Sequence, residues 1–365
     1  MKRPVLLWFL FVPFLVTGQV PFVQPLLAPL AFNPSSAGNK RTLRTALIFN
    51  HWEKQTDKGT NGYGSVDAFV KKIKAGIGMY YQRQTLSSGV DKSNIADADT
   101  PPGLKMQNNG ASHSFGLVLA PKYNIMNRTE TGIKYTISPS LFVSYTYSNQ
   151  HHTGNFSSQN VATCNCEGIK ISSFDVVNYT QSAMKNKVLT LGLGGMFSSN
   201  QVIIFGRFQH QTEYDAEEFD VARYYFNDAT FKQTTYKLKN TLYSLQGMLG
   251  MGITFPKNTR APFSVTTTIA AEGRHYLNLE NGDGTTGYET ATFQGKKGTH
   301  FTTKQGVLQF KYYTLLFGTA WAQTMGQNLY GVSAGIQTGW MKTLLTFYTY
   351  SSYRFVELGT TIWLK

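Results

Sequence analysis

The sequence predicts an all-β fold, a transmembrane outer-membrane β-barrel of about fourteen antiparallel strands, from three observations. Charged residues make up only 15% of the 365 residues and aromatic residues 14%, whereas soluble domains carry roughly 25% charge. Long segments alternate between apolar and hydroxyl-bearing residues, and the chain begins with an apolar leader. Strands that face lipid exclude charge, and aromatic residues gather at membrane interfaces, so a barrel in a membrane explains this composition.

The leader, residues 1–18, is typical of a secretory signal peptide. Lys2 and Arg3 form a basic start, residues 5–16 form an apolar core, and small residues precede Gln19. The core is too short for a stable membrane-spanning helix, and no later segment holds about eighteen uninterrupted apolar residues. We therefore expect the chain to be exported and to have no helical membrane span.

Residues 19–41 come next, and we expect them to form an ordered N-terminal lead-in to the first strand, on the periplasmic side or in the lumen of the barrel. Asn33 can accept a hydrogen bond in a turn, Pro34 imposes an extended approach, and Gly38 permits a left-handed turn. The simpler alternative is a turn that only starts the first strand. Residues 42–365 then form the barrel as a single unit.

The clearest strand is "YTISPSLFVSYTYS", residues 135–148. Tyr135, Ile137, Leu141, Val143 and Tyr145 fall on one face, which we expect to meet lipid, and hydroxyl residues fall on the other. A tilted membrane strand needs roughly ten residues, whereas soluble strands average about five or six. The length of this run therefore favours a membrane barrel over a soluble sandwich.

Similar runs predict an even number of strands separated by connections of alternating length. The connections around 53–61, 86–111, 148–186, 213–234 and 277–301 are longer than their neighbours. This parity is typical of an outer-membrane barrel with long extracellular loops and short periplasmic turns. The expected strands are 42–52, 62–70, 75–85, 112–123, 132–147, 187–197, 201–212, 235–255, 263–276, 302–310, 312–322, 328–338, 342–350 and 355–364.

The charge balance restricts the partners. The formal net charge is +14, or +12 without Lys2 and Arg3. For an exported chain, this favours anionic lipid headgroups or an acidic protein partner over nucleic acid. Cys164 and Cys166 lie too close together to stabilise the chain much as a disulfide, and no second Cys or His pair at zinc spacing accompanies them. We interpret them as a pair local to one loop.

Candidate catalytic residues are few. His210 with Glu213 and Asp215, and His275 with Glu272, have residue types suited to acid–base chemistry. No spacing brings a nucleophile, a base and an acid together. We therefore expect a protein that is not an enzyme and that holds no cofactor and no metal.

The stretch between the leader and the first strand carries a family resemblance. Asn33-Pro34 is followed by Ala37-Gly38, and the first strand ends near Trp52. This order resembles the PorP/SprF family of outer-membrane proteins from the type IX secretion system. The resemblance implies that these residues are candidates for docking a partner.

A second match lies near the C-terminus. Tyr348 and Tyr350 match a Tyr-x-Tyr motif of the family, although Ser351 stands where an Asp commonly follows. Glu357 sits where members often carry a His-Glu pair, with Val356 in place of the His. Glu357 therefore joins the docking candidates.

The resemblance implies a non-enzymatic role in the outer membrane, in the export or surface attachment of adhesins, including those of gliding motility. The expected partners are outer-membrane lipid, a secreted adhesin or its C-terminal domain, and other type IX secretion components. Two alternatives remain open. One is a passive channel for a small solute, and the other is a soluble secreted β-sandwich or a barrel hydrolase.

Overall fold

The computed structural model describes residues 29–39, 43–54, 57–91, 105–128, 133–155, 178–199, 201–225, 230–256, 262–276, 299–324, 327–350 and 353–364. The expected signal peptide, residues 19–28 and both cysteines lie outside these ranges.

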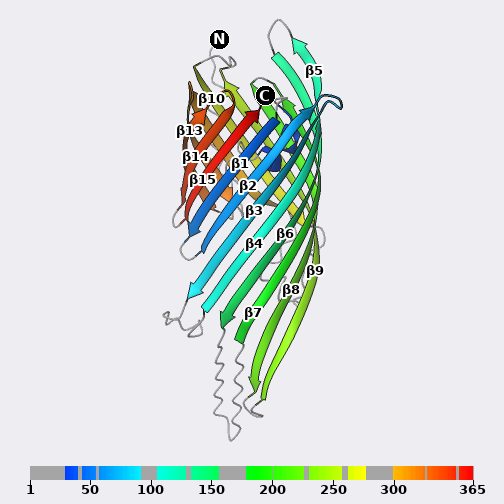
Figure 1. The fold of residues 1–365 in the computed structure, drawn as a ribbon, viewed down its shortest axis with the longest axis vertical. Coiled ribbons are helices and arrows are strands. Elements are labelled where there is room, and N and C mark those ends of the chain that lie inside the picture. Colours follow the sequence, from blue (N-terminus) through cyan, green and yellow to red (C-terminus); the bar gives the residue numbers. More distant parts are fainter. Residues whose placement is uncertain are drawn as a thin grey trace.

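The described chain is almost entirely β-structure (Figure 1). Two short helical turns come first, α1 (Pro29–Phe32) and the 3₁₀ turn η2 (Pro34–Ser36). The strands are β1 (Leu43–Lys54), β2 (Asp57–Val70), β3 (Ala75–Asp91), β4 (Lys105–Pro121), β5 (Tyr123–Arg128), β6 (Ile133–Asn155), β7 (Asn178–Ser198), β8 (Val202–Tyr225), β9 (Thr230–Phe255), β10 (Phe263–Tyr276), β11 (Thr299–Tyr312), β12 (Leu315–Thr324), β13 (Gln327–Gln337), β14 (Met341–Tyr350) and β15 (Tyr353–Leu364).

These strands form one closed antiparallel barrel. Apart from β4 and β5, consecutive strands pair with each other, and β1 pairs with β15 from Leu43↔Leu364 to Lys54↔Tyr353, which closes the sheet. β4 and β5 both pair with β6 and are separated only by Lys122, so they act as one interrupted strand. Counting β4 and β5 as one strand, the barrel has fourteen strands, and the predicted fold class is confirmed.

The barrel has two different rims. At the turn rim, β1 begins, β15 ends, and tight turns such as residues 71–74 join consecutive strands. At the loop rim, residues 92–104, 156–177 and 277–298 separate the strands. Two of the long loops expected there were predicted wrongly: β1 and β2 leave only residues 55–56 between them, and β8 and β9 leave only 226–229.

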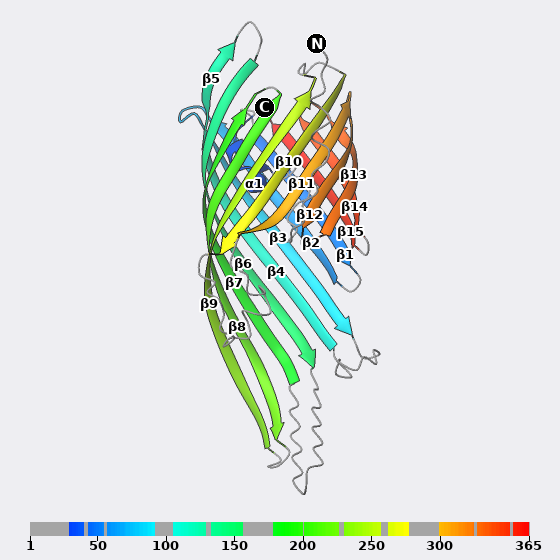
Figure 2. The ribbon, with the colours of Figure 1, turned by 180° about the vertical axis from the view of Figure 1, so that it is seen from behind.

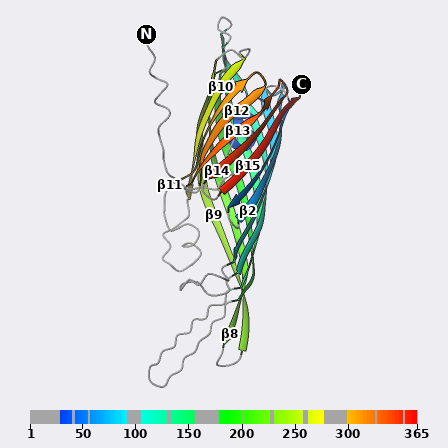
Figure 3. The same ribbon diagram turned by 90° about the vertical axis from the view of Figure 1, so that its left-hand side faces the viewer.

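The reason for this error is that the strands themselves continue toward the loop rim. β3, β4, β6, β7, β8 and β9 have 17 to 26 residues, and we call them the tall wall. β10 to β15 with β1 and β2 have 10 to 14 residues, and we call them the short wall. Figures 1 and 3 show β8 and β9 extending far beyond the short wall.

Apolar side chains form a belt on the outside of the barrel. On β6, Ile137, Leu141, Val143 and Tyr145 are exposed, whereas Ser138, Ser140 and Ser144 between them are buried, so the predicted outer face of this strand is confirmed. Such a belt on a closed barrel is the architecture of an outer-membrane protein. Among the described residues, no helix is long and apolar enough to cross a membrane.

The belt on the tall wall ends at one row of cross-strand partners. Arg83, His113, Tyr147, Lys187 and Tyr214 follow one another in register from β3 to β8. Going from the turn rim toward the loop rim, the first charged side chains on the outer face of these strands lie in this row. β7 and β8 continue roughly ten residues beyond it, about 30 Å along the strands. The outer part of the tall wall therefore extends past the lipid.

Five of the aromatic side chains on the inner surface share one arrangement. Each lies over a glycine that is its direct partner on the next strand, and a Cβ added to that glycine would overlap the ring. The ring thereby fills the space where the glycine has no side chain, and it lies flat against the inner surface of the sheet. The five pairs are Trp52–Gly59, Tyr80–Gly116, Phe142–Gly192, Phe205–Gly250 and Tyr348–Gly331.

Candidate functional site: an N-terminal plug inside the barrel

Residues 29–39 fold into a compact segment inside the barrel, which we call the plug (Figure 2). The Asn33 N–H donates to the Pro29 carbonyl at 2.9 Å and closes α1. Pro34 starts η2, where its fixed φ suits a first helical position. Gly38 has φ +63°, a left-handed conformation that glycine adopts without strain. The local sequence therefore turns the chain twice within eleven residues.

Three consecutive plug side chains reach three different sectors of the wall. Leu30 packs with an apolar cluster on β4 and β6 that includes Val118 and Phe142. Ala31 packs against a cluster on β1, β2, β12 and β14 that includes Leu344. Phe32 packs against residues of β7 to β10, and its ring lies 5.4 Å from that of Phe205, edge to face. The plug therefore spans the lumen from wall to wall.

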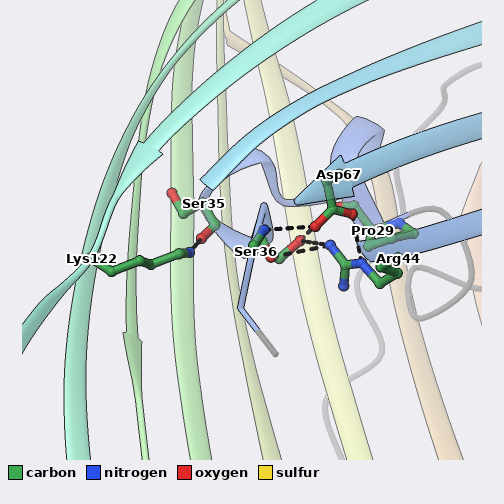
Figure 4. Close-up of polar contacts among 7 residues, drawn as sticks. Pro29, Ser35, Ser36, Arg44, Asp67 and Lys122 are labelled. Carbon is green, nitrogen blue, oxygen red and sulfur yellow. Dashed lines mark hydrogen bonds and ion pairs between the residues drawn. The ribbon is translucent and has the colours of Figure 1, made fainter. Parts of the chain in front are cut away.

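A buried ion pair holds the C-terminal end of the plug. The Asp67 carboxylate on β2 accepts hydrogen bonds from the Gly38 N–H at 2.6 Å and from Arg44 Nε at 2.7 Å (Figure 4). Arg44 Nη2 also donates to the carbonyl and hydroxyl of Ser36, at 3.1 and 3.2 Å. Because the carboxylate is paired and accepts a backbone N–H, its burial is compensated.

Ser35 binds a neighbouring part of the wall, at the junction of β4 and β5 and on β6. Its carbonyl accepts hydrogen bonds from Lys122 Nζ at 2.6 Å and from the Ser138 hydroxyl at 2.9 Å. Its own hydroxyl lies 2.8 Å from that of Ser140. Lys122 is the residue that interrupts β4 and β5, so the break in the strand coincides with a contact to the plug.

A third anchor connects α1 to both walls. Arg207 on β8 donates to the Ala31 carbonyl, and its Nη2 lies 2.5 Å from Glu272 Oε1 on β10. Gln246 on β9 donates to the same Glu272 oxygen at 2.5 Å. Arg207 and Glu272 are mostly buried, so this network holds three strands and the plug together.

The wall also makes room for the plug by leaving side chains out. A Cβ on Gly76 would fall on the Ala37 carbonyl, and one on Gly78 would lie 2.7 Å from Leu30 Cδ1. Ala37 itself is fully buried. The "AGIG" sequence at the start of β3 therefore forms part of the seat of the plug.

The structure brings four of the six candidate docking residues together. Asn33, Pro34, Ala37 and Gly38 all lie in the plug and are all buried. The Asn33 side chain lies within hydrogen-bonding distance of the Met196 sulfur, at 3.4 Å. Their fixed separations correspond to the two turns of the plug.

Trp52 and Glu357 lie elsewhere, in the inner surface nearer the loop rim. Trp52 is the register partner of Phe355 on β15, and Glu357 is fully buried between its partners Asn50 on β1 and Thr346 on β14. These two residues belong to the seam that closes the barrel.

Sequence reasoning missed the wall residues that hold the plug. One usable signal existed, because Asp67 falls in phase with the inward-facing Tyr63 and Ser65 on β2, and a charge on that face needs a partner. Glu272 had been considered with His275 for acid–base chemistry, but it pairs with Arg207. No group of three or more His, Cys, Asp or Glu residues that could hold a metal occurs in the described ranges.

No protein-family model matches this chain, and no curated protein sequence matches it. Solved structures with similar folds include the P. putida toluene transporter TodX, 8% identical over 95% of this chain and 94% of that one, with a TM-score of 0.44. A Pseudomonas aeruginosa FadL homologue is 9% identical over 96% and 98%, with a TM-score of 0.46. The translocator domain of the autotransporter NalP from Neisseria meningitidis is 9% identical over 88% of each chain, with a TM-score of 0.38. These likenesses concern the barrel architecture alone.

Proposed function

We propose that this protein is a plugged outer-membrane barrel of the type IX secretion system, which receives or anchors a secreted surface adhesin through protein–protein contacts and without catalysis. The observation that carries the proposal is the plug. Leu30, Ala31 and Phe32 contact three sectors of the wall. A segment held inside the barrel in this way narrows the path for solutes and leaves the rims and the plug as surfaces for partners.

The family resemblance supports the same proposal from the sequence. Asn33, Pro34, Ala37 and Gly38 carry the resemblance, and the same residues form the two turns of the plug. A flexible tail would have no need for these residues at fixed separations. The proposed docking role therefore concerns a segment with a defined shape.

The use of charge in the lumen supports a non-enzymatic role. Asp67, Lys122, Arg207 and Glu272 each make hydrogen bonds to the plug or to a residue that holds it. These contacts use the charged groups for structure.

A passive channel is the second candidate, and one observation favours it. Amide side chains lie on the inner surface of β8, β9, β11 and β12, beside apolar ones, and such polar groups suit a wetted path. These residues are Gln209, Gln246, Gln305, Gln309 and Gln323. A channel function would require the plug to leave its seat.

Conductance separates the two candidates. The full chain is reconstituted in planar bilayers beside a variant that lacks residues 29–39. We expect a closed wild-type barrel and a conducting deletion variant. Steady conductance of the wild-type protein would favour the channel.

Surface display tests the adhesin role. Surface proteins that disappear when the gene is deleted are identified first, and their display is then measured in cells with the same plug deletion. We expect the variant to remain a heat-modifiable barrel in the outer membrane but to lose display of these proteins. Unchanged display would contradict the anchoring role.

A further inference from the structure

The short wall carries a groove of about 620 Å³ that crosses five neighbouring strands, β10 to β14. This volume lies within the range of roughly 300–1,000 Å³ that is usual for ligand pockets. The large side chains along the groove are Ile269, Leu308, Trp321, Tyr330, Val332 and Phe347. All of them except Trp321 are exposed, so the groove opens outward from the barrel and not into the lumen.

Gly306 on β11 leaves part of this groove open. It falls on the outer face of its strand, in phase with the exposed Leu308, and its direct partners are Ile269 and Trp321. A Cβ added to Gly306 would lie 3.6 Å from Ile269 Cγ2 and 3.7 Å from Trp321 Cε3, which is ordinary contact. The space over Gly306 can therefore accept part of another molecule.

The groove lies in the half of the belt that is nearest the loop rim. Trp321, Tyr330 and Thr349 are successive direct partners, and they fall close to the loop-rim ends of β12, β13 and β14. Lys304, two residues beyond Gly306 toward that rim, is the first charged side chain on the outer face of β11. The loop rim of an outer-membrane barrel is extracellular, so lipids of the outer leaflet meet this groove.

An exposed cation lies at one end of the groove. Arg354, the second residue of β15, is the register partner of Thr349. Its partner on the other side is Glu53 on β1, whose own next partner is Lys58 on β2. Within the part of the chain that the structure describes, Arg354 makes no ion pair, and Glu53 lies 3.3 Å from His51. The Arg354 guanidinium can therefore bind an anion that lies over the groove.

We infer that this groove binds one lipid of the outer leaflet with a phosphate in its headgroup, an acyl chain over Gly306 and the phosphate at Arg354. The occupant is a lipid because the groove opens within the apolar belt, where lipid surrounds the barrel. A guanidinium binds phosphate oxygens through two parallel hydrogen bonds, and Lys304 adds a second positive charge. The inference does not depend on the proposed function.

The binding experiment uses the full-length chain in phosphatidylcholine vesicles, in a variant whose tryptophans other than Trp321 are replaced by phenylalanine. A brominated acyl chain quenches the fluorescence of a tryptophan that it contacts, so it reports a lipid beside Trp321. We expect brominated phosphatidic acid, which has a bare phosphate headgroup, to bind about fivefold more tightly than brominated phosphatidylcholine. Equal quenching by the two lipids at equal mole fraction would overturn the inference.

Two variants test the two ends of the groove. Arg354→Gln should remove most of the preference for phosphatidic acid, because it removes the phosphate ligand. Gly306→Leu should reduce quenching by both lipids, because the new side chain occupies the space of the acyl chain. Heat-modifiable mobility on gels verifies that each variant is folded, and Arg354→Gln changes only an exposed side chain.

Lys58→Gln is the matched control. Lys58 is an exposed cation in the same row as Arg354, but β1 separates it from β15, so its loss should leave the preference unchanged. An equal loss of preference in Lys58→Gln and Arg354→Gln would indicate general attraction to the basic surface and would overturn the site. Unchanged quenching in Gly306→Leu would show that the acyl chain lies elsewhere, and it would equally overturn the inference.

Discussion

The tall and short walls share the same antiparallel backbone geometry but differ in how far their strands extend beyond the membrane. Crossing a membrane as a tilted strand takes roughly 9–11 residues, and the short wall, with 10 to 14 residues per strand, hardly exceeds this. The tall wall uses the same length inside the belt and then continues as a sheet in water. The difference shows that the barrel is a membrane anchor on one side and also a projecting surface on the other.

The largest expected effect concerns the contact that joins the two walls. Arg207→Met removes the cation that links β8, β10 and the plug, and leaves the Glu272 carboxylate buried beside Gln246 alone. Breaking such a pair is expected to lower the unfolding free energy by about 3–5 kcal/mol. Urea unfolding of the refolded protein in lipid vesicles measures it.

A double variant provides the control. Arg207→Met combined with Glu272→Met should recover part of the lost stability, because no uncompensated charge remains. Equal stability of the single variant and the native protein would show that the walls hold together without this link.

The next effect tests where the membrane ends on the tall wall. Leu193 on β7 is 62% exposed in the middle of the belt, and Tyr214 on β8 is 50% exposed in the row that ends it. Leu193→Arg should destabilise the barrel by about 2–4 kcal/mol in lipid, and Tyr214→Arg by about 0–1 kcal/mol. The same vesicle unfolding assay compares them. Similar values for both would mean that the belt continues farther along the tall wall.

A smaller effect tests whether the two walls share one packing arrangement. Gly250→Ala on β9 and Gly331→Ala on β13 each place a Cβ against an aromatic ring, Phe205 or Tyr348. Overpacking of this kind is expected to destabilise each variant by about 1–3 kcal/mol. Gly247→Ala is the control, because nothing lies within 4 Å of its added Cβ. A loss in only one wall would show that the two sets of pairs are not equivalent.

The smallest effect is expected from removing the projection itself. Residues 216–239 are deleted, and the register partners Asp215 and Asn240 are joined by an Asn-Gly turn, which suits a two-residue hairpin. Barrel stability in lipid should change little, because the belt strands remain whole and only pairing beyond the belt, including that of residues 178–185 on β7, is lost. Thermal unfolding monitored by gel mobility measures this. Failure to assemble would show that the projection is needed for folding.

The sequence predicted the short wall more closely than the tall wall. The expected strand 263–276 coincides with β10, and 342–350 differs from β14 by one residue. By contrast, the strand expected at 201–212 continues to Tyr225. Alternation of apolar and polar residues records contact with lipid on one face, so it disappears where a strand leaves the membrane although its backbone pairing continues.

The candidate site was predictable only in its local part. Pro34 restricts its own backbone, Asn33 favours a turn and Gly38 permits a left-handed conformation, so these turns can be predicted from the local sequence. The partners of the plug come from distant strands, and choosing Asp67, Lys122 and Arg207 requires the register and closure of the whole barrel. No local pattern contains that information.

The seat of the plug also sets an order of events in time. Ala31 lies in the first tenth of the chain, yet it contacts Arg207, 176 residues away, and packs against a cluster that contains Leu344 near the C-terminus. Contacts between such distant residues form slowly, because a long loop must close before they contribute. The plug is synthesised before the strands that it contacts. It can complete its contacts only after β14 has joined the sheet, so a fully bound plug requires a nearly complete barrel.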